Sequence, residues 1–497
     1  MIHSLSLSDV LADHARSRPQ VTAVVDGEVR LTYPELDARV TRLASALQGL
    51  GVSGGDRVVW LGQNAHAVLE LLLACSRLGA VFCPANWRQA ADELRFVVND
   101  LTPAVVVWEP SEATTAVRDE SAASARWVRA GEEYERLVEG AAAREFPQVD
   151  DGEPVLALYT AAFAGRPGAA LLSSAALVAH ATSLLVVRQM EPGFTFLNNG
   201  PLFHVGTMMF CLATFQIGGT NVFTPAFDPE EACRLIDAER VTQAFLFGPM
   251  IDAVAKANAD GKYDLSSLRF VAHSAEWDGM ITVDDSPWCR SKMGGYGQTE
   301  VGGMLTFLGL AEGGAGFAGR PSPLVQIRIL APGGSEVPAG EVGEICARGK
   351  TLFSGYFARP DLNAEKSAYG WHHTGDLGRR EPDGTITFIG PKLRMIKSGA
   401  ENVYPAEVER ALKSHPAVAD AAVIGIPDPD WHQAVKAIVT LRAQATEADL
   451  LEHVRTLLAS YKKPKRITFV DEIPKRGFTP DYDALDETHG GGNYPGA

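Results

Sequence analysis

The 497 residues are 46% hydrophobic, which is enough apolar material for two or three domains with cores of their own. The formal net charge of −16, without a long basic run, argues against nucleic acid or an anionic membrane as a partner. No stretch approaches the ~20 apolar residues of a membrane span, and the first residues do not read as a signal peptide, so we expect a cytoplasmic protein.

Strand and helix patterns alternate through the first part of the chain. Apolar residues recur at three- and four-residue steps from Leu36, and Gly51 ends that helix. The polar stretch 111–124 is expected to be a surface excursion. The alternation, which predicts a parallel α/β sheet, is carried by strand 57–61, helix 67–78, strand 79–84, strand 105–108 and strand 155–159.

The pattern continues through residues 195–301 and then changes. Short strands are predicted at 325–330, 343–348 and 385–389. After Gly390 a compact α+β unit follows, and residues 490–497 are expected to be disordered. The elements of this unit are helix 405–415, strand 419–426, strand 435–441, helix 447–460 and strand 466–470.

The six cysteines are dispersed, and none belongs to a Cys-x-x-Cys pair. This spacing predicts neither a disulfide framework nor a zinc site. We expect the cysteines to be buried apolar residues, at positions Cys75, Cys83, Cys211, Cys233, Cys289 and Cys346.

Four segments carry ordered motifs, and a fifth is degenerate. The intact segments are 201–206 (PLFHVG), 296–300 (YGQTE), 371–376 (WHHTGD) and 396–405 (IKSGAENVYP), and the degenerate one is 159–169 (YTAAFAGRPGA). Together they resemble the signatures of the adenylate-forming (ANL) superfamily of acyl-CoA synthetases, and this resemblance covers nearly the whole chain. That family joins a carboxylate to ATP, and then lets the thiol of CoA displace AMP from the acyl-adenylate.

The resemblance implies an α/β fold in two parts. The large N-terminal domain, residues 1–391, would contain parallel and mixed sheets flanked by helices, with a small β-barrel-like region, and would bind AMP and the acyl group. The small domain, residues 392–497, would be a mobile α+β unit whose loop faces CoA. We place the boundary near residues 391–393, because the family joins its domains directly after the glycine that corresponds to Gly390.

Three departures from the family affect the ATP half-reaction. In the phosphate loop, hydroxyl, glycine and lysine positions are replaced by Ala161, Ala162, Phe163, Ala164 and Gly168, while Gly165 and Arg166 offer a backbone turn and one cation. Pro480 stands where the family has the lysine that offsets charge during adenylation. At the hinge, Pro391 and Leu393 replace the usual arginine and charged pivot. Weak or absent adenylation is therefore expected, although Arg166 replacing the lost lysine is a competing interpretation.

The nucleotide-binding positions are otherwise retained. By the resemblance, Tyr296 stacks on adenine, Thr299 contacts the α-phosphate, Glu300 is a possible Mg²⁺ ligand and Asp376 binds both ribose hydroxyls. The full predicted AMP site is Thr160, His273, Ser274, Ala275, Glu276, Tyr296, Gly297, Thr299, Glu300 and Asp376.

The resemblance also assigns an acyl pocket and a CoA-facing loop. His204 would lie beside the acyl carbonyl, in a pocket of Phe203, His204, Thr207, Met208, Gly294, Gly295, Val301 and Met304. Gly399 would border the pantetheine tunnel, or else be a turn glycine with positive φ. The predicted CoA contacts are Lys397, Ser398, Gly399, Ala400, Lys436 and Lys463, with Lys462 as a further candidate. His204, Gly399 and Thr299 are the expected catalytic positions.

These positions predict an acyl-CoA ligase that makes a thioester from a preformed acyl-adenylate and CoA. The chain looks like the non-adenylating CoA ligases of terpenoid natural-product pathways such as platensimycin biosynthesis, so a separate adenylating enzyme is a possible partner. A carrier-protein thiol could replace CoA, and Mg²⁺ need not be required. The alternatives are a conventional ATP-dependent acyl-CoA synthetase and an inactive acyl-AMP-binding partner of another synthetase.

Overall fold

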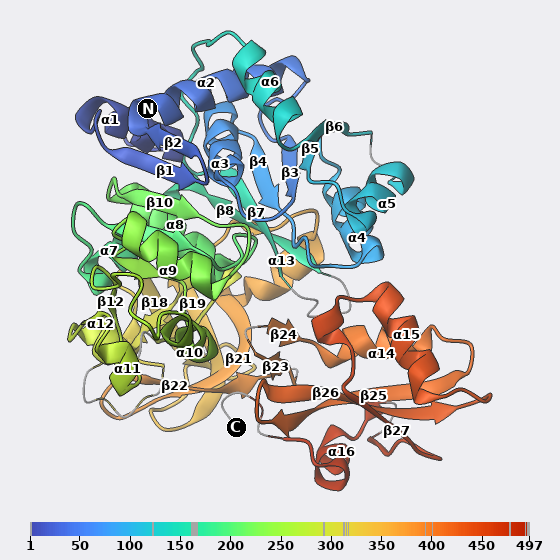
Figure 1. The fold of residues 1–497 in the computed structure, drawn as a ribbon. Coiled ribbons are helices and arrows are strands. Elements are labelled where there is room, and N and C mark those ends of the chain that lie inside the picture. The colour runs from blue at the N-terminus through green and yellow to red at the C-terminus, as the bar shows by residue number, and fades with distance from the viewer. Residues whose placement is uncertain are drawn as a thin grey trace.

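A computed structural model of the chain (Figure 1) describes almost all of its length. The described residues are 2–121, 124–160, 167–291, 294–311, 314, 316, 318–392, 394–399, 401–476, 479–492 and 494. Within this part of the chain, no helix is long and apolar enough to cross a membrane. All six cysteines are buried and free, as expected.

The first sheet has seven strands in the order β20-β8-β7-β4-β3-β5-β6, and it is parallel from β7 to β6. Alternate residues of β3 serve opposite faces: Val58 and Trp60 pack in the cluster with α2 and α3, whereas Val59 and Leu61 pack with α4. Burial on both faces explains the continuous apolar runs of these strands. The elements are α2 (Tyr33–Gly49), β3 (Arg57–Leu61), α3 (His66–Leu78), β4 (Val81–Pro84), α4 (Ala91–Leu101), β5 (Val105–Trp108), α5 (Glu112–Glu120), β6 (Arg126–Arg129), α6 (Glu132–Gly140), β7 (Pro154–Thr160), β8 (Gly168–Ser173) and β20 (Gly355–Tyr356).

The start of α2 shows how local sequence fixes these elements. Thr32 accepts a hydrogen bond from the Glu35 amide, and the Glu35 carboxylate accepts one from the Thr32 amide. This reciprocal cap satisfies two backbone donors at the helix start, and Pro34 fits the first turn because its missing N–H is not needed there.

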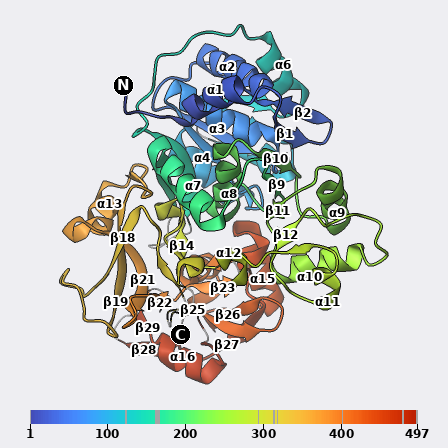
Figure 2. The ribbon, with the colours of Figure 1, turned by 90° about the vertical axis from the view of Figure 1, so that its left-hand side faces the viewer.

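The second sheet, in the order β11-β9-β10-β1-β2, is parallel except for the β1–β2 hairpin. Helices α7 and α8 lie side by side (Figure 2), and they pack on the first sheet through Leu177, Val205 and Met208. The elements are α1 (Leu7–Ser17), β1 (Thr22–Asp26), β2 (Val29–Thr32), α7 (Ser174–Arg188), β9 (Thr195–Asn198), α8 (Val205–Gln216), β10 (Thr220–Phe223), α9 (Pro229–Ala238), β11 (Gln243–Ala244), α10 (Gly248–Ala257), α11 (Ala275–Asp278) and α12 (Pro287–Arg290).

A third sheet, β18-β19-β21-β22, is antiparallel and contains the short strands expected from the sequence. Two small hairpins and a parallel strand pair precede it along the chain. The elements are β12 (Arg269–Phe270), β13 (Thr282–Val283), β14 (Gly297–Gln298), β15 (Gly303–Met304), β16 (Thr306–Phe307), β17 (Arg320–Pro321), β18 (Val325–Leu330), β19 (Val342–Gly349), α13 (Pro360–Lys366), β21 (His372–Arg380) and β22 (Ile386–Pro391).

The last hundred residues form the separate orange-to-red lobe of Figure 1. Its sheet has the order β24-β23-β26-β25, with β27 parallel to β26. The elements are β23 (Ile396–Ser398), β24 (Glu401–Val403), α14 (Pro405–Lys413), β25 (Val418–Asp428), β26 (His432–Leu441), α15 (Glu447–Leu457), β27 (Arg466–Phe469), β28 (Lys475–Arg476), β29 (Thr479–Pro480) and α16 (Tyr482–His489). The predicted fold class, α/β with a small α+β C-terminal unit, is confirmed.

Two segments hold more ordered structure than their composition suggested, although 111–120 does lie largely at the surface. Within 111–124, Ser111 accepts a hydrogen bond from the Thr114 amide and starts helix α5, whose Val117 is buried. The tail after Gly490 is partly ordered, because the Tyr494 hydroxyl accepts from the Gly425 amide at 3.2 Å and donates to Asp486 at 2.9 Å. In both segments a single capping or docking contact orders the backbone, although the polar or glycine-rich composition favours irregular structure.

Candidate active site

The residues expected to hold a nucleotide meet where β21 lies beside the β14–β15 hairpin. The hydroxyl of Tyr296 donates a 2.6 Å hydrogen bond to Oδ2 of Asp376 on β21. The Tyr296 ring stacks on Phe388, with ring centroids 5.3 Å apart. Gln298 Nε2 lies 3.3 Å from the Tyr296 hydroxyl, and its Oε1 lies 2.8 Å from His372 Nε2. The structure therefore brings together the predicted adenine-stacking and ribose-binding residues.

Asp376 is a carboxylate with an altered proton affinity. Burial raises its pKa to about 6, and the hydrogen bond from Tyr296 opposes that rise. At neutral pH the group is charged, and its two oxygens can each accept from one of two neighbouring hydroxyls. This chemistry fits the predicted contact with ribose.

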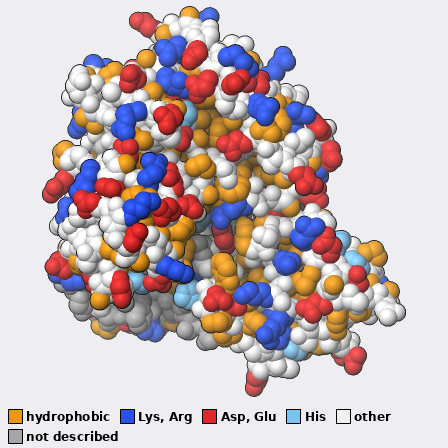
Figure 3. Space-filling view, viewed as in Figure 1, with side chains coloured by type: hydrophobic (Ala, Val, Ile, Leu, Met, Phe, Trp, Pro, Cys, Tyr) orange, Lys and Arg blue, Asp and Glu red, His pale blue; other side chains and the backbone are white. Residues whose placement is uncertain are grey.

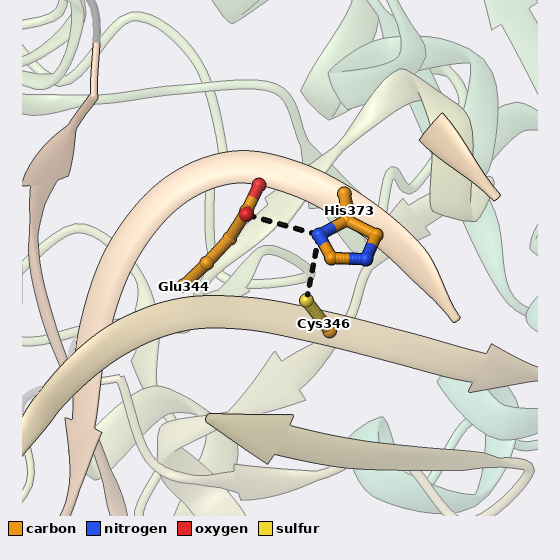
Figure 4. Close-up of side chains that lie close together, drawn as sticks. All are labelled: Glu344, Cys346 and His373. Atoms are coloured by element: carbon orange, nitrogen blue, oxygen red, sulfur yellow. Dashed lines mark hydrogen bonds and ion pairs between the residues drawn. The ribbon is translucent and has the colours of Figure 1, made fainter. Parts of the chain in front are cut away.

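A cluster on β19 and β21 braces this part of the site (Figure 4). Glu344 Oε2 accepts from Nδ1 of His373 at 2.9 Å, and Cys346 Sγ lies 3.4 Å from the same nitrogen. Burial alone would raise the pKa of Glu344, but the bonds from His373 and Lys392 lower it. These three side chains are of types that can ligate a metal, and the sequence spacing did not reveal them. Here they are engaged with one another and with Lys392.

Glu300, the expected Mg²⁺ ligand, is buried. Its Oε1 accepts from the Tyr356 hydroxyl at 2.7 Å. Burial raises its pKa, while hydrogen bonds from Tyr356 and Thr160 lower it. Mg²⁺ is commonly held by one or two carboxylates together with substrate oxygens, so this carboxylate fits the ion only alongside a bound phosphate. Thr299 precedes it in the same 3₁₀ turn, Thr299–Val301.

His204 is the residue directly before α8. Its Nδ1 accepts from the Gly206 amide at 2.9 Å, which places the proton of the neutral ring on Nε2. Part of the ring is open to solvent, yet the protein packed around it lowers its pKa; Glu401 opposes this effect, and Lys397 and Arg88 add to it. A neutral imidazole with an Nε2 donor suits hydrogen bonding to an acyl carbonyl oxygen.

The β23–β24 turn of the small lobe stands against this histidine loop. Arg88 Nη2 bonds to Glu401 Oε1 at 2.5 Å, and the same guanidinium lies 5.1 Å above the centre of the Phe203 ring. Gly399 has a φ of +60°, and a Cβ there would lie 2.8 Å from the Trp431 ring. The positive φ agrees with the turn interpretation of this glycine. Its role beside pantetheine stays a prediction.

The lysines expected to contact CoA differ in their surroundings. Lys397 is largely buried and donates to Asn402 Oδ1 at 2.9 Å. Lys436 donates to the backbone carbonyl of His489 at 2.9 Å. Lys463, next to Lys462 in sequence, is half-buried. Of these three lysines, Lys463 is the one whose ammonium group forms no hydrogen bond or ion pair with the described residues.

Lys462 corrects the expectation that it could meet CoA phosphates. Its ammonium is buried between Glu93 Oε1 at 2.6 Å and Glu407 Oε1 at 2.9 Å. Glu93 lies on α4 and also accepts from the Ala459 amide at 2.6 Å. This lysine therefore joins the small lobe to the large one.

A small cavity of about 10 Å³, room for about one water molecule, lies behind the histidine loop. Of the predicted acyl-pocket residues, Met208 lines it, and Met304 donates its amide to His180 Nε2 at 2.8 Å. Burial lowers the pKa of His180 to about 4, so it is a neutral acceptor. Sequence reasoning missed most of the lining, which is Leu156, Leu172, Leu177, His180, Ala181, Val205, Met208, Met209, Leu212 and Gly302.

The structure gives the surroundings of two further predicted acyl-pocket residues, Thr207 and Gly295. Thr207 is fully buried on α8, and its hydroxyl has no hydrogen-bond partner among the described residues. A Cβ at Gly295 would lie 2.6 Å from the Met304 methyl carbon, so that glycine lets the methionine approach the strand closely. Their contact with an acyl group stays a prediction.

Residues 273–276 span the N-cap and the first turn of α11, which begins at Ala275. Ser274 caps that helix by accepting from the Trp277 amide at 3.3 Å, and His273 Nε2 bonds to Asp252 at 2.8 Å. Ala275 and Glu276 are exposed. The hydrogen bonds of this segment therefore tie it to α10 and α11, and its place at the edge of the adenine site stays a prediction.

Several predicted positions lie outside the described residues: Ala161, Ala162, Phe163, Ala164, Gly165, Arg166, Leu393 and Ala400. Pro480 is described, on β29, where it pairs with Lys475 of β28. Lys475 itself forms an ion pair with Asp420 at 2.8 Å. The cation nearest to Pro480 in this hairpin is thus held by a carboxylate of the small lobe.

Sequence comparisons follow the same division of the chain. The AMP-binding enzyme family matches residues 11–357, and the AMP-binding enzyme C-terminal domain matches residues 407–477. The chain is 38% identical over 474 residues to a feruloyl-CoA synthase from Amycolatopsis sp, with 93% of this chain and 94% of that protein covered. It is 33% identical to an indoleacetate–CoA ligase from Aromatoleum aromaticum, with 95% of each covered.

Among solved structures, the chain resembles o-succinylbenzoate CoA synthetase from Bacillus subtilis in two states. Against a double mutant bound with its product analogue OSB-NCoA, the TM-score is 0.83, with 24% identity and 96% and 98% of the two chains covered. Against that synthetase in complex with AMP, the TM-score is 0.67, with 24% identity and 94% and 95% covered.

Proposed function

Because the chain belongs to the AMP-binding enzyme family and is an acid–thiol ligase, we propose that it acts in the second half of the ligase reaction. Its substrates would be a preformed acyl-adenylate and CoA, and its products an acyl-CoA thioester and AMP. A separate adenylating enzyme would supply the acyl-adenylate. In this activity the chain would resemble the non-adenylating CoA ligases of natural-product pathways.

The observation that carries this proposal is the placement of the β23–β24 turn against His204. The ion pair between Arg88 and Glu401 holds the turn there, with Gly399 and Lys397 beside the histidine loop. A thiol delivered past this turn would reach the carbonyl next to His204. Figure 3 shows hydrophobic and charged side chains together in the recess between the small lobe and the rest.

The chemistry required is one nucleophilic displacement. The CoA sulfur forms a bond to the acyl carbon, the bond from that carbon to the phosphate oxygen breaks, and AMP leaves with the electron pair. The thiol proton goes to solvent or to a base. His204 would donate from Nε2 to the carbonyl oxygen, where negative charge develops, and Asp376 would hold the ribose in place.

Weak adenylation is the second element of the proposal. Proline at position 480 offers neither a charge nor a donor, and Lys475 is engaged with Asp420. Among its hydroxyl positions the phosphate loop keeps Thr160 but has lost the others, and it lacks the lysine. Mg²⁺, which would be held at Glu300 beside a triphosphate, is then dispensable. We also propose that residues 1–391 and 392–497 are the two domains, with the hinge between them.

A conventional ATP-dependent ligase is the second candidate. The observation that favours it is the 38% identity to a feruloyl-CoA synthase over nearly the whole length of both chains. An aromatic or aliphatic acid, ATP and CoA would then be the substrates, and Arg166 would replace the missing loop lysine.

One paired assay separates these functions. The enzyme is given synthetic cinnamoyl-AMP with CoA, and in parallel cinnamic acid with ATP, Mg²⁺ and CoA, and cinnamoyl-CoA is measured by chromatography. Thioester from the adenylate alone supports the proposal, whereas equal rates from both mixtures support the conventional ligase. Thioester from neither mixture, across aromatic and aliphatic acyl groups, would leave only the adenylate-binding partner.

A further inference from the structure

Arg188, the last residue of α7, carries a buried guanidinium surrounded by aromatic rings. The rings of Phe210, Trp288 and Phe194 have centres 4.6, 5.2 and 5.5 Å from the guanidinium carbon. The residue is 7% exposed, and none of its Nε, Nη1 and Nη2 atoms has a hydrogen-bond partner among the described residues. The indole Nε1 of Trp288 is buried and without a partner in the same part of the structure.

No carboxylate in the described chain neutralises this cation by direct contact. Burial lowers the pKa of Arg188 to about 9, and the charges of Cys289 and Asp284 raise it, so the guanidinium is still a cation at neutral pH. The Asp284 carboxylate interacts with other groups: it lies 4.0 Å from Arg269 and accepts a hydrogen bond from the Ser286 amide at 2.8 Å. The aromatic rings attract the cation but leave its N–H groups without acceptors.

A buried guanidinium without hydrogen-bond acceptors raises the free energy of the folded state unless another group supplies those acceptors. A buried charge without a hydrogen-bonded partner destabilises the folded state, because the cation has lost its water. The donors of Arg188 and Trp288 all require an oxygen acceptor, and a guanidinium matches the two oxygens of a carboxylate. Buried unmatched groups of this kind mark a position where a ligand supplies the missing partner.

The cage and the cavity behind the histidine loop draw residues from the same two helices, α7 and α8. Ala181 lines the cavity and lies seven residues before Arg188, on the same face of α7 and about 10 Å away along the helix axis. On α8, Met209 lines the cavity and the next residue, Phe210, contacts Arg188. Met209, Ala181 and Trp288 belong to one packed cluster. Arg188 therefore lies further along α7 than the cavity-lining Leu177 and Ala181, and it contacts Phe210 of α8 rather than Val205 next to His204.

We propose that Arg188 and Trp288 bind a second carboxylate at the far end of the acyl group, so that the substrates are dicarboxylic acids activated at one end. This inference rests on the proposed function, because it assumes that the reacting carbonyl lies beside His204. The apolar side chains between the two ends would have to move apart to hold the hydrocarbon or aryl part, because the cavity itself has room for about one water molecule. An acyl group that ends in a methyl or an unsubstituted ring would leave the cation without its partner.

The test measures binding and turnover with two matched pairs of adenylates. One pair is 4-carboxycinnamoyl and 4-nitrocinnamoyl, where nitro is a planar neutral counterpart of carboxylate, and the other is suberoyl and octanoyl. Dissociation constants of the four acyl-sulfamoyl adenosines are measured by calorimetry, and kcat/KM is measured for the four acyl-AMPs with CoA. We expect the wild type to prefer the carboxylated member of at least one pair by tenfold or more in both readouts.

Arg188→Met, which keeps the length and removes the charge, should abolish that preference, and Arg188→Lys should keep part of it. Arg290→Met, an exposed arginine on the same short helix as Trp288, is the matched control and should retain the full preference. The melting temperature of Arg188→Met should be unchanged or higher, because an unpaired buried charge has been removed. A purely structural arginine would instead give a large fall in melting temperature.

The inference is overturned if the wild type prefers neither carboxylated member, or if Arg188→Met leaves the preference unchanged. Failure of the proposed function looks different. In that case no acyl-AMP yields thioester, while calorimetry still reports whether carboxylated sulfamoyl adenosines bind more tightly and whether this depends on Arg188.

Discussion

Tyr296 and Asp376 share a 2.6 Å hydrogen bond, so the carboxylate predicted to bind ribose is already paired with the phenol predicted to stack on adenine. The two residues are 80 positions apart in sequence and meet only because β21 lies beside the β14 hairpin. Binding of AMP would replace or share this bond with the ribose hydroxyls. The ribose hydroxyls must therefore compete with the Tyr296 hydroxyl for the carboxylate of Asp376.

Asp376→Asn should weaken AMP binding. The amide keeps the size of the side chain but offers one acceptor oxygen instead of two and no charge. Loss of a charge-assisted hydrogen bond costs about 1.5–3 kcal/mol, or roughly ten- to hundredfold in affinity. Calorimetry with AMP measures this, with Asp361→Asn on exposed α13 as the control. Equal affinities for wild type and Asp376→Asn would remove Asp376 from the nucleotide site.

AMP affinity should also depend on pH. Because burial raises the pKa of Asp376 to about 6, the charged form that accepts both hydroxyls is lost as the pH falls through that value. If only the carboxylate binds, the apparent dissociation constant should rise about tenfold between pH 7 and pH 5. The phosphate of AMP also titrates in this range, so adenosine, which lacks it, is the ligand to use. A pH-independent affinity for adenosine in the wild type contradicts the assignment, and Asp376→Asn should show none of the dependence.

Gly399→Ala should strain the β23–β24 turn. Its φ of +60° is unfavourable for a residue with a Cβ by roughly 1–2 kcal/mol, and the added carbon would press on the Trp431 ring. We expect a lower melting temperature for the small lobe and a slower thioester step, with AMP binding by the large lobe retained. Gly49→Ala, where a Cβ meets open space, is the control. A stable variant with full thioester activity would contradict both roles of this glycine.

Reversing the ion pair tests the arrangement of the lobes. Arg88→Glu places two carboxylates side by side and should slow thioester formation from acyl-AMP several-fold, without weakening AMP binding. The double variant Arg88→Glu/Glu401→Arg should regain much of the rate, since the pair is restored with opposite polarity. Arg136→Glu, on exposed α6, serves for comparison. If the double variant is no faster than Arg88→Glu, the pair does not hold the productive arrangement.

Pro480→Lys should not create an ATP-dependent synthetase. A lysine there would restore one cation, but the phosphate loop would still lack its lysine and its hydroxyls other than that of Thr160. ATP–pyrophosphate exchange in the presence of several acids measures adenylation directly, and a feruloyl-CoA synthase provides a positive control for the assay. Strong exchange by the wild type would refute the half-reaction, and exchange gained only by Pro480→Lys would show that the loop is competent.

The sequence predicted the sheets well because fully buried parallel strands must be apolar, as in β4 and β5, where every residue is buried. Lys462 was misjudged because no local pattern reveals Glu93 and Glu407 as its partners. His180 and Arg188 went unnoticed for the same reason: single polar residues in an apolar helix gain meaning only from what surrounds them. The nucleotide-binding residues could be predicted because they lie in motifs whose order along the chain identifies the family.

The buried bridge of Lys462 has a consequence for the balance between conformers. Rotating the small lobe about residues 391–392 would separate the ammonium from Glu93 on α4 while Glu407 moved with it. Breaking a buried ion pair costs about 3–5 kcal/mol, which would limit the rotated conformer to roughly one molecule in a hundred or fewer. A two-step synthetase would meet that barrier in every cycle, whereas an enzyme confined to the second step would rest in its working state.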